Sequence, residues 1–257
     1  MNSALDELIA TIARLRAPGG CPWDREQTHK SILSCLLDET YEFFEAAENN
    51  DEKGMREELG DLLLQVILHA HMASETGSFT IDDVARGINE KLIRRHPHVF
   101  GEVQASTSKE VLKNWETIKK KEKEHRKYLV DDIPDALPAL FRAEKMQRRV
   151  ARVGFDWTDM EPVLDKVEEE FAEFRRAVNN NDHANAQEEL GDILFALVNV
   201  ARHKNMCAED ALRAAVKKFA RRFRYIEDWY AQHGKDLPSS TLDEMDKVWE
   251  QSKKAVG

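Results

Sequence analysis

Residues 38–63 read DETYEFFEAAENNDEKGMREELGDLL, and residues 169–194 read EEFAEFRRAVNNNDHANAQEELGDIL. The two stretches align without a gap, so that Glu39 corresponds to Glu170 and Asp61 to Asp192. Two further blocks match in the same order, residues 91–95 with 218–222 and residues 115–120 with 249–254. A chain that repeats three blocks in one order contains a duplicated domain.

The repeated stretches have the pattern of helices. Apolar residues recur at helical spacing over residues 31–48 and 55–74, with a short polar break between them. The second copy repeats this pattern, and the absence of period-two alternation predicts that there are no strands. Asp131, Pro134 and Pro138 interrupt the pattern between the copies. We therefore expect an all-α protein of two tandem four-helix-bundle-like domains, residues 1–128 and 139–257, joined by a linker at 129–138.

Composition restricts the class of protein. Of 257 residues, 33% are charged and 42% are hydrophobic, with only 11 glycines and 7 prolines, which excludes collagen-like and disordered chains. No apolar run reaches the ~18 residues of a membrane span, and the first residues do not resemble a signal peptide. Three widely spaced cysteines fit a reducing cytoplasm. The formal net charge of -10 disfavours nucleic acid as a partner, so we expect a cytoplasmic protein that binds neither nucleic acid nor membranes.

Each copy carries four acidic residues whose spacing gathers them on helix faces. Glu39 and Glu42 lie one turn apart on the first helix, as do Glu58 and Asp61 on the next. The short break makes the two helices antiparallel neighbours, so the four carboxylates meet. They repel one another unless a cation neutralises them, and oxygen ligands favour Mg²⁺, with Mn²⁺ as a possible substitute. The second copy offers the same set, namely Glu170, Glu173, Glu189 and Asp192.

A solvated acidic face is the alternative interpretation, and it would be preferred for a single Glu-x-x-Glu. The recurrence of all four acids beside apolar residues favours a metal site. A ferritin-like di-iron bundle would place a histidine where this sequence has Asp61 and Asp192, which counts against that class.

The acidic motif and its flanks resemble the MazG family of nucleoside triphosphate pyrophosphohydrolases. The flanks are GGCPWD at residues 19–24, RRHPHVF at 94–100 and VGFDW at 153–157. The resemblance implies an all-α fold, a homodimer, and the Mg²⁺-dependent reaction of NTP with water to give NMP and pyrophosphate. The family motif EExxE is complete in the second copy, as Glu169, Glu170 and Glu173, whereas Asp38 replaces the leading Glu in the first.

The phosphates and the attacking water require further residues. Glu169 or Glu170 is expected to accept the proton of the water, and the sequence does not separate metal ligand from base. The residues expected to bind the nucleotide are Lys166, Lys218, Arg222 and Trp249, with Lys91 and Arg95 in the first copy. A solvated helix surface is the alternative for the cations, and a core position is the alternative for Trp249.

The copies differ at one informative position. Lys166 precedes Glu170 by one helical turn, and the equivalent residue of the first copy is Cys35. The presence of Lys166 and the complete EExxE motif in the second copy together predict that residues 139–257 are the main catalytic half. We expect an NTP and dNTP pyrophosphohydrolase of broad, house-cleaning specificity. The alternatives are a narrower dUTP- or phosphoribosyl-ATP-type enzyme and a non-catalytic metal- or nucleotide-binding sensor.

Overall fold

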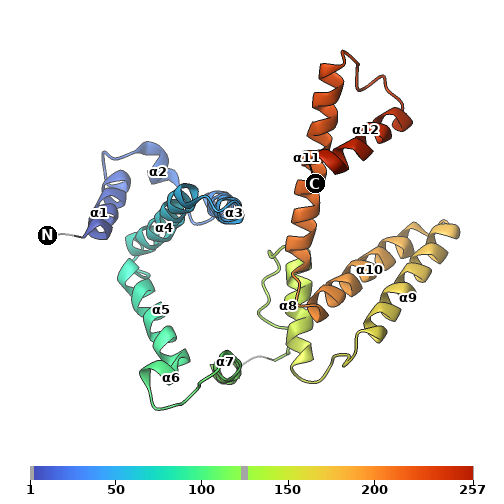
Figure 1. Ribbon diagram of the computed structural model, residues 1–257. Helices are drawn as coiled ribbons and strands as arrows, with labels where there is room; N and C mark the ends of the chain where they lie inside the picture. The colour runs from blue at the N-terminus through green and yellow to red at the C-terminus, as the bar shows by residue number, and fades with distance from the viewer. Residues whose placement is uncertain (1–2, 123–126, 257) are drawn as a thin grey trace. The chain divides into compact units, whose positions relative to one another are not determined.

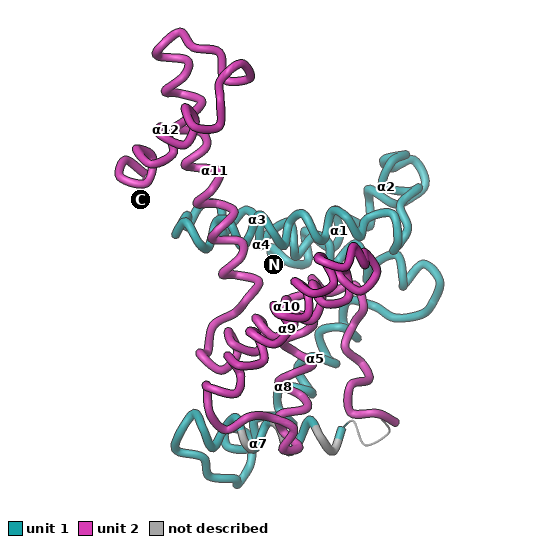
Figure 2. Tube along the Cα trace, turned by 90° about the vertical axis from the view of Figure 1, so that its right-hand side faces the viewer, with its two compact units in different colours: residues 1–124 teal, residues 125–257 magenta. Residues whose placement is uncertain are grey.

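The computed structural model describes residues 3–122 and 127–256, and its regular secondary structure is helical throughout that part of the chain (Figure 1). The all-α prediction is confirmed. Contacts divide the chain into two compact units, residues 1–124 and 125–257 (Figure 2). The stretch expected as a linker lies in the second unit, where Ile133 is buried and Arg149 donates to the carbonyl oxygen of Leu129. Within the described residues, no helix is long and apolar enough to cross a membrane.

The helices are numbered in the order in which they follow one another along the chain. Those of the first unit are α1 (Ala4–Arg16), α2 (Pro22–Glu26), α3 (Leu33–Glu48), α4 (Glu52–Glu75), α5 (Ile81–Arg95), α6 (Pro97–Phe100) and α7 (Ser108–Glu122). Those of the second unit are α8 (Ala139–Ala151), α9 (Glu161–Asn179), α10 (His183–His203), α11 (Ala208–Gln232) and α12 (Leu242–Ala255).

In the first unit, α3 and α4 form the helix pair that carries the acids (Figure 1). Asn50 makes the turn between them, with a φ of 54° in the left-handed region that asparagine tolerates. Asp51 then caps α4, because its side chain accepts hydrogen bonds from the N–H groups of Lys53 and Gly54. The cap makes α4 begin at Glu52, earlier than the apolar spacing predicted. α1 packs on α4 through a core of Ile12, Ile32, Ile67, Leu68 and Met72.

The second unit repeats this arrangement with α9 and α10. Asn181 makes the turn with a φ of 53°, and Asp182 caps α10 by accepting a hydrogen bond from the N–H group of Asn185. α8 packs against α10 and α11, and α12 folds back along α11 around a core that includes Ile226 and Tyr230. The same local signals therefore place two acid-bearing helix faces against each other in both copies.

Candidate active site

In the first unit, α3 and α4 bring their acids together as the spacing predicted. One carboxylate oxygen from each of Glu39, Glu58 and Asp61 lies within 4.8 Å of the others. Burial, followed by repulsion from the neighbouring carboxylates, raises the pKa of both Glu39 and Glu58. The fourth acid, Glu42, contributes to this repulsion. Oε2 of Glu58 is buried and has no hydrogen-bond partner within the described part of the chain.

The second unit gathers the equivalent acids from α9 and α10. Carboxylate oxygens of Glu170, Glu173 and Glu189 lie within 4.8 Å of one another. Glu170 is buried, with 6% of its surface exposed. Burial raises the pKa of Glu189, and the charges of Glu173, Glu170 and Asp192 raise it further. Asp192 is exposed and borders a cavity described below.

Both clusters fit a divalent cation. Their donors are all carboxylate oxygens, the ligand type that Mg²⁺ and Mn²⁺ prefer. Burial and then the neighbouring carboxylates raise the pKa of Glu58 and of Glu189, and the unpartnered oxygen of Glu58 is one that a cation would satisfy. A cation at either cluster, and its identity, stay predictions.

Lys166 distinguishes the second cluster from the first. Its Nζ lies 2.8 Å from Oε1 of Glu170 and 3.0 Å from Oε1 of Glu169. These hydrogen bonds raise the pKa of Lys166, so the ammonium is charged over the whole physiological range. Cys35 occupies the equivalent position on α3 and offers no such charge.

The other predicted nucleotide-binding residues of the second copy form a separate group on α11 and α12. The guanidinium of Arg222 lies 5.8 Å from the centre of the Trp249 ring, and Lys218 is exposed one turn earlier on α11. Trp249 is only partly buried, and its ring also packs against Phe219. The α11–α12 pair extends away from the α9–α10 pair (Figure 1). Within the second unit, Lys218, Arg222 and Trp249 therefore lie apart from the acids of α9 and α10.

The first copy has the same cation–aromatic pair with one addition. Arg95 lies 5.6 Å from the Trp115 ring, and its Nε donates to Oε2 of Glu122 at 3.1 Å. Hydrogen bonds from Arg95 and then from Arg94 lower the pKa of Glu122 to about 2. Lys91 is exposed on α5. Arg95 is thus held by an acid in the first copy.

The second copy lacks that acid. The residue equivalent to Glu122 is Val256. The Nε of Arg222 is buried without a hydrogen-bond partner among the residues that the structure describes. The guanidinium of Arg222 is therefore better placed than that of Arg95 to pair with an anion from outside the chain.

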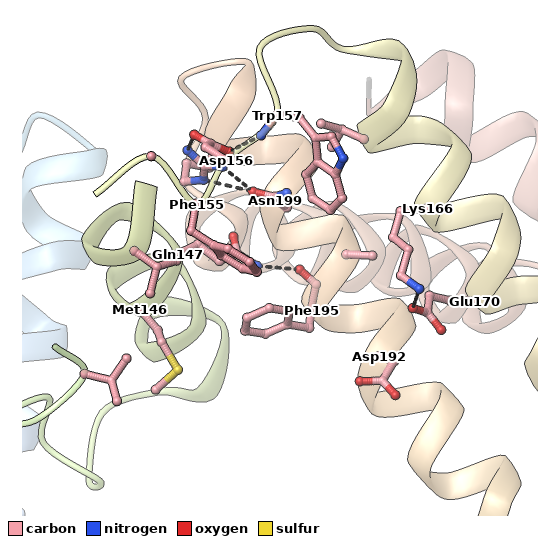
Figure 3. Close-up of a pocket in the computed structure, with 16 residues that line it drawn as sticks. Met146, Gln147, Phe155, Asp156, Trp157, Lys166, Glu170, Asp192, Phe195 and Asn199 are labelled. Carbon is pink, nitrogen blue, oxygen red and sulfur yellow. Dashed lines mark hydrogen bonds and ion pairs between the residues drawn. The ribbon is translucent and has the colours of Figure 1, made fainter. Parts of the chain in front are cut away.

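A cavity of about 650 Å³ adjoins the second acidic cluster, between α8, α9, α10 and the loop that follows α8 (Figure 3). Lys166, Glu170 and Asp192 line one side, and Phe155 and Trp157 line another. The lining also includes three polar side chains that the sequence analysis did not single out, Gln147, Asn199 and Arg202. The only sequence signal near them was the VGFDW segment at residues 153–157.

Asp156 and Arg202 fix the loop that closes the cavity. Nη1 of Arg202 donates to Oδ2 of Asp156 at 2.7 Å, and Nε2 of His203 lies 3.1 Å from Oδ1. These hydrogen bonds lower the pKa of Asp156 to about 2, and the bond from Arg202 has a larger effect than the bond from His203. The loop is therefore attached to α10 by a charge-assisted pair.

Comparison with known proteins places these features in a family. A family model described as the MazG nucleotide pyrophosphohydrolase domain matches residues 27–100 and again residues 159–226. The chain belongs to the MazG nucleotide pyrophosphohydrolase family. The two matched MazG segments contain both acidic clusters, and the chain is accordingly a hydrolase that acts on nucleotide pyrophosphate bonds.

Individual relatives align with nearly the whole of the chain. The chain is 48% identical to the nucleoside triphosphate pyrophosphohydrolase of Escherichia coli (strain K12), over 97% of each chain. It is 44% identical to the nucleoside triphosphate pyrophosphohydrolase/pyrophosphatase MazG of Thermotoga maritima, over 96% of this chain and 95% of the relative. It is also 49% identical to YabN of Bacillus subtilis, but covers 50% of that longer protein.

Proposed function

We propose that the protein is a Mg²⁺-dependent nucleoside triphosphate pyrophosphohydrolase of broad specificity, converting an NTP or dNTP and water to the monophosphate and pyrophosphate. The observation that carries the proposal is the second acidic cluster with Lys166 beside it. Such a site places carboxylate oxygens that can bind a metal next to the ammonium of Lys166, which can bind a phosphate. Catalysis of phosphoanhydride cleavage needs mainly positioning and charge neutralisation.

The residues of the second unit take distinct roles in this proposal. Glu170, Glu173, Glu189 and Asp192 would hold Mg²⁺, which supplies the positive charge that offsets the triphosphate. Glu169 is exposed next to the cluster and is the proposed base that accepts the proton of the attacking water. Lys166 is the proposed phosphate-binding residue beside the cluster. Lys218, Arg222 and Trp249, which the second unit holds apart from its acids on α11 and α12, stay predicted nucleotide contacts.

Differences between the copies support catalysis in the second unit. Lys166 lies 2.8 Å from Glu170, whereas Cys35 stands at its equivalent beside Glu39. The first unit also pairs Arg95 with Glu122, so this cation is already neutralised. Glu39, Glu42, Glu58 and Asp61 are therefore proposed as a metal site with little or no turnover.

A homodimer in the cytoplasm is part of the same proposal. Phe171 on α9 and Leu190 and Leu194 on α10 are 49%, 47% and 45% exposed, which leaves an apolar face uncovered on the catalytic helix pair. A second copy of the chain is the proposed cover. The three free cysteines are consistent with a reducing compartment.

The test is product analysis by ion-exchange chromatography after incubation with Mg²⁺ and a panel of NTPs and dNTPs. We expect NMP and pyrophosphate from several bases. Glu170→Ala and Asp192→Ala should each lower turnover at least 100-fold, while the matched variants Glu39→Ala and Asp61→Ala keep most of it. Equal losses from both pairs would contradict the assignment to the second unit.

Other products would change the proposal in defined ways. NDP and phosphate would place cleavage at the γ-phosphate and refute the proposed reaction. Turnover of a single nucleotide would replace broad specificity with a narrow enzyme of the dUTP or phosphoribosyl-ATP type. Absence of any product, with Mn²⁺ also tried, would leave a metal- or nucleotide-binding sensor.

A further inference from the structure

The acid-bearing helices α9 and α10 are fixed against each other at one end by a turn. Asn181 makes this turn, and Asp182 caps α10. α9 begins at the opposite end of the pair, and its N-cap is Met160, whose apolar side chain offers no oxygen to the first N–H groups of the helix. Because helix ends fray, the position of the start of α9 depends on contacts made by the loop before it.

The loop before α9 is attached to α10 by an anchor of three residues, Asp156, Arg202 and Asn199 (Figure 3). Nη1 of Arg202 donates to Oδ2 of Asp156 at 2.7 Å, and its Nε donates to Oδ1 of Asn199 at 2.9 Å. The side chains of Arg202 and Asp156 are 10% and 25% exposed, so solvent screens this pair less than a surface pair. Oδ1 of Asp156 also accepts from the backbone N–H of Trp157 at 3.0 Å, which fixes the loop itself.

The anchor lies level with the start of α9. Carboxylate oxygens of Glu173 and Glu189 meet between the two antiparallel helices, and this register puts Glu161, the first residue of α9, level with the residues around Arg202. Lys166 follows about one and a half helical turns later, and Glu170 comes one turn after that. A shift at the start of α9 would therefore move Lys166 and Glu170 relative to the acids of α10.

The first unit has other residues at the positions of the anchor. The left-handed glycines Gly19 and Gly154 mark equivalent points of the two loops, which puts Cys21 in the place of the aspartate. The ungapped alignment of α4 with α10 puts His71 in the place of the arginine. Nε2 of His71 lies 3.6 Å from Oε1 of Glu75 on its own helix. The ionic attachment between loop and helix is thus a feature of the second unit.

A weaker contact attaches the corresponding segment of the first unit. Nδ1 of His29, in the segment before α3, lies 2.8 Å from Nδ1 of His69 on α4. Burial and then the charge of His29 lower the pKa of His69, so its imidazole is neutral at pH 7. A hydrogen bond between neutral groups is roughly half as strong as a charge-assisted one. The unit that contains Lys166 is therefore also the unit whose acid-bearing helices are held by charged groups.

We propose that Asp156 and Arg202 are positioning residues for the reaction, because their ion pair sets the start of α9 against α10 and so holds Lys166 and Glu170 in register with the acids of α10. This inference rests on the proposed function. Asn199 orients the guanidinium from one side while Asp156 binds it from another. A guanidinium suits this role, because its donors form a rigid fork that an ammonium does not provide.

The first test is steady-state kinetics of full-length variants with ATP and Mg²⁺, at a temperature where circular dichroism shows every variant to be folded. Asp156→Asn and Arg202→Gln should each lower kcat about tenfold, the lower end of the effect of outer-shell partners of a metal site, and change KM less than kcat. The double variant should lose no more than either single variant, because both changes remove the same attachment. Asp156→Glu, which keeps the charge, should regain part of the loss.

The first unit supplies a matched control for general destabilisation. Arg16 donates to both carboxylate oxygens of Glu75 at 2.8 Å, so this pair resembles the anchor in geometry but lies in the other unit. Glu75→Gln should lower the melting temperature and leave kcat unchanged.

Binding of Mn²⁺ gives a second readout that does not need turnover. Glu39→Ala serves as the background, because it removes a ligand of the first cluster and leaves the second to be titrated by electron paramagnetic resonance. In this background, Asp156→Asn should raise the Kd of Mn²⁺ about tenfold, and Glu75→Gln should leave it unchanged.

The outcomes separate this inference from the proposed reaction. If Asp156→Asn and Arg202→Gln leave kcat and the Kd of Mn²⁺ within twofold of the wild type, the anchor only stabilises the fold and the inference is overturned. If the wild type cleaves no NTP, the proposed reaction fails and the Kd of Mn²⁺ decides: a rise supports the anchor, and no change overturns it. Absence of both turnover and Mn²⁺ binding overturns both. Should Asp156→Asn unfold, Arg202→Lys, which keeps the charge without the fork, replaces it in each comparison.

Discussion

Lys166 shows how one side chain can separate two copies of the same helix pair. It neutralises part of the charge on Glu169 and Glu170 through hydrogen bonds of 3.0 and 2.8 Å. In the first copy, Cys35 leaves Glu39 with acidic neighbours that raise its pKa. A fixed ammonium beside a metal site can stabilise the negative charge of phosphate oxygens as the bond breaks.

Replacing Lys166 should therefore affect the reaction more than the fold. We expect Lys166→Ala to lower kcat/KM about 100-fold, in the range found when one charge-stabilising group is removed from an active site. Lys166→Arg should recover part of the loss. Steady-state kinetics measures both, and Cys35→Ala, at the equivalent position, should behave as the wild type. Unchanged kcat/KM in Lys166→Ala would remove Lys166 from the catalytic site.

Asp156 gives a pH-dependent prediction. Its pKa of about 2 lies below its ordinary value of 3.8, so its ionised form stabilises the folded state. That stability is complete above about pH 4 and is lost as the pH falls through about 2. Asp156→Asn should cost about 1.5–3 kcal/mol at pH 7, the range for hydrogen bonds to charged groups. Denaturant titrations at several pH values should show that the free energies of unfolding of the variant and the wild type approach each other towards pH 2. A difference that stays constant with pH would show that the ionisation of Asp156 is not its cause.

At the scale of single helices, both acid-bearing pairs depend on the same turn. An asparagine with positive φ is followed by an aspartate that caps the next helix, as Asn50–Asp51 in one copy and Asn181–Asp182 in the other. The cap sets where Glu58 and Glu189 fall relative to the preceding helix.

Loss of either cap should destabilise its own unit. Asp51→Ala and Asp182→Ala should each cost about 1 kcal/mol of folding free energy, the usual value of an N-cap side chain. Thermal unfolding followed by circular dichroism measures this change, and Asp51→Asn and Asp182→Asn, which keep a capping oxygen, should stay close to the wild type. A loss as large in the asparagine variants would indicate that charge, not capping, matters here.

Features with a local cause could be predicted from the sequence, and those that depend on packing could not. The helix pairs and the meeting of Glu170 with Glu189 follow from spacing and a short turn. Apolar spacing places the start of α4 too late, because the helix begins directly after its cap, Asp51, before the first apolar residue of the pattern. The separation of Trp249 from the acids follows from the direction in which α11–α12 packs, which periodicity does not contain (Figure 1). The cavity could not be predicted because Gln147 reaches it from a different helix.

At the scale of the whole molecule, two acidic clusters lie in a chain of formal net charge -10. Their repulsion opposes folding, and a ligand that binds only the folded state opposes unfolding. The stability of each unit should therefore depend on divalent cations.

Removing the metal should lower the melting temperature. Mg²⁺ at 100 times its Kd should stabilise a unit by about 2.7 kcal/mol relative to protein treated with EDTA. Glu39→Ala should abolish the gain in the first unit and Glu170→Ala in the second, as followed by calorimetry. KCl at matched ionic strength is the control. An equal rise in melting temperature in KCl would show that the salt only screens the charges and that no specific metal site is present.

The left-handed glycines Gly19 and Gly154 mark the same turn in both copies, although the residues that follow them differ. Gene duplication has thus preserved a backbone while its interior diverged. Because the scaffold is shared, interior side chains of one unit can be introduced into the other at equivalent positions. The triple change Ile12→Gln, Gln65→Ala and Leu68→Asn would place in the first unit the equivalents of Gln147, Ala196 and Asn199, so the duplication leaves one interior free to accumulate substitutions while the other keeps its own.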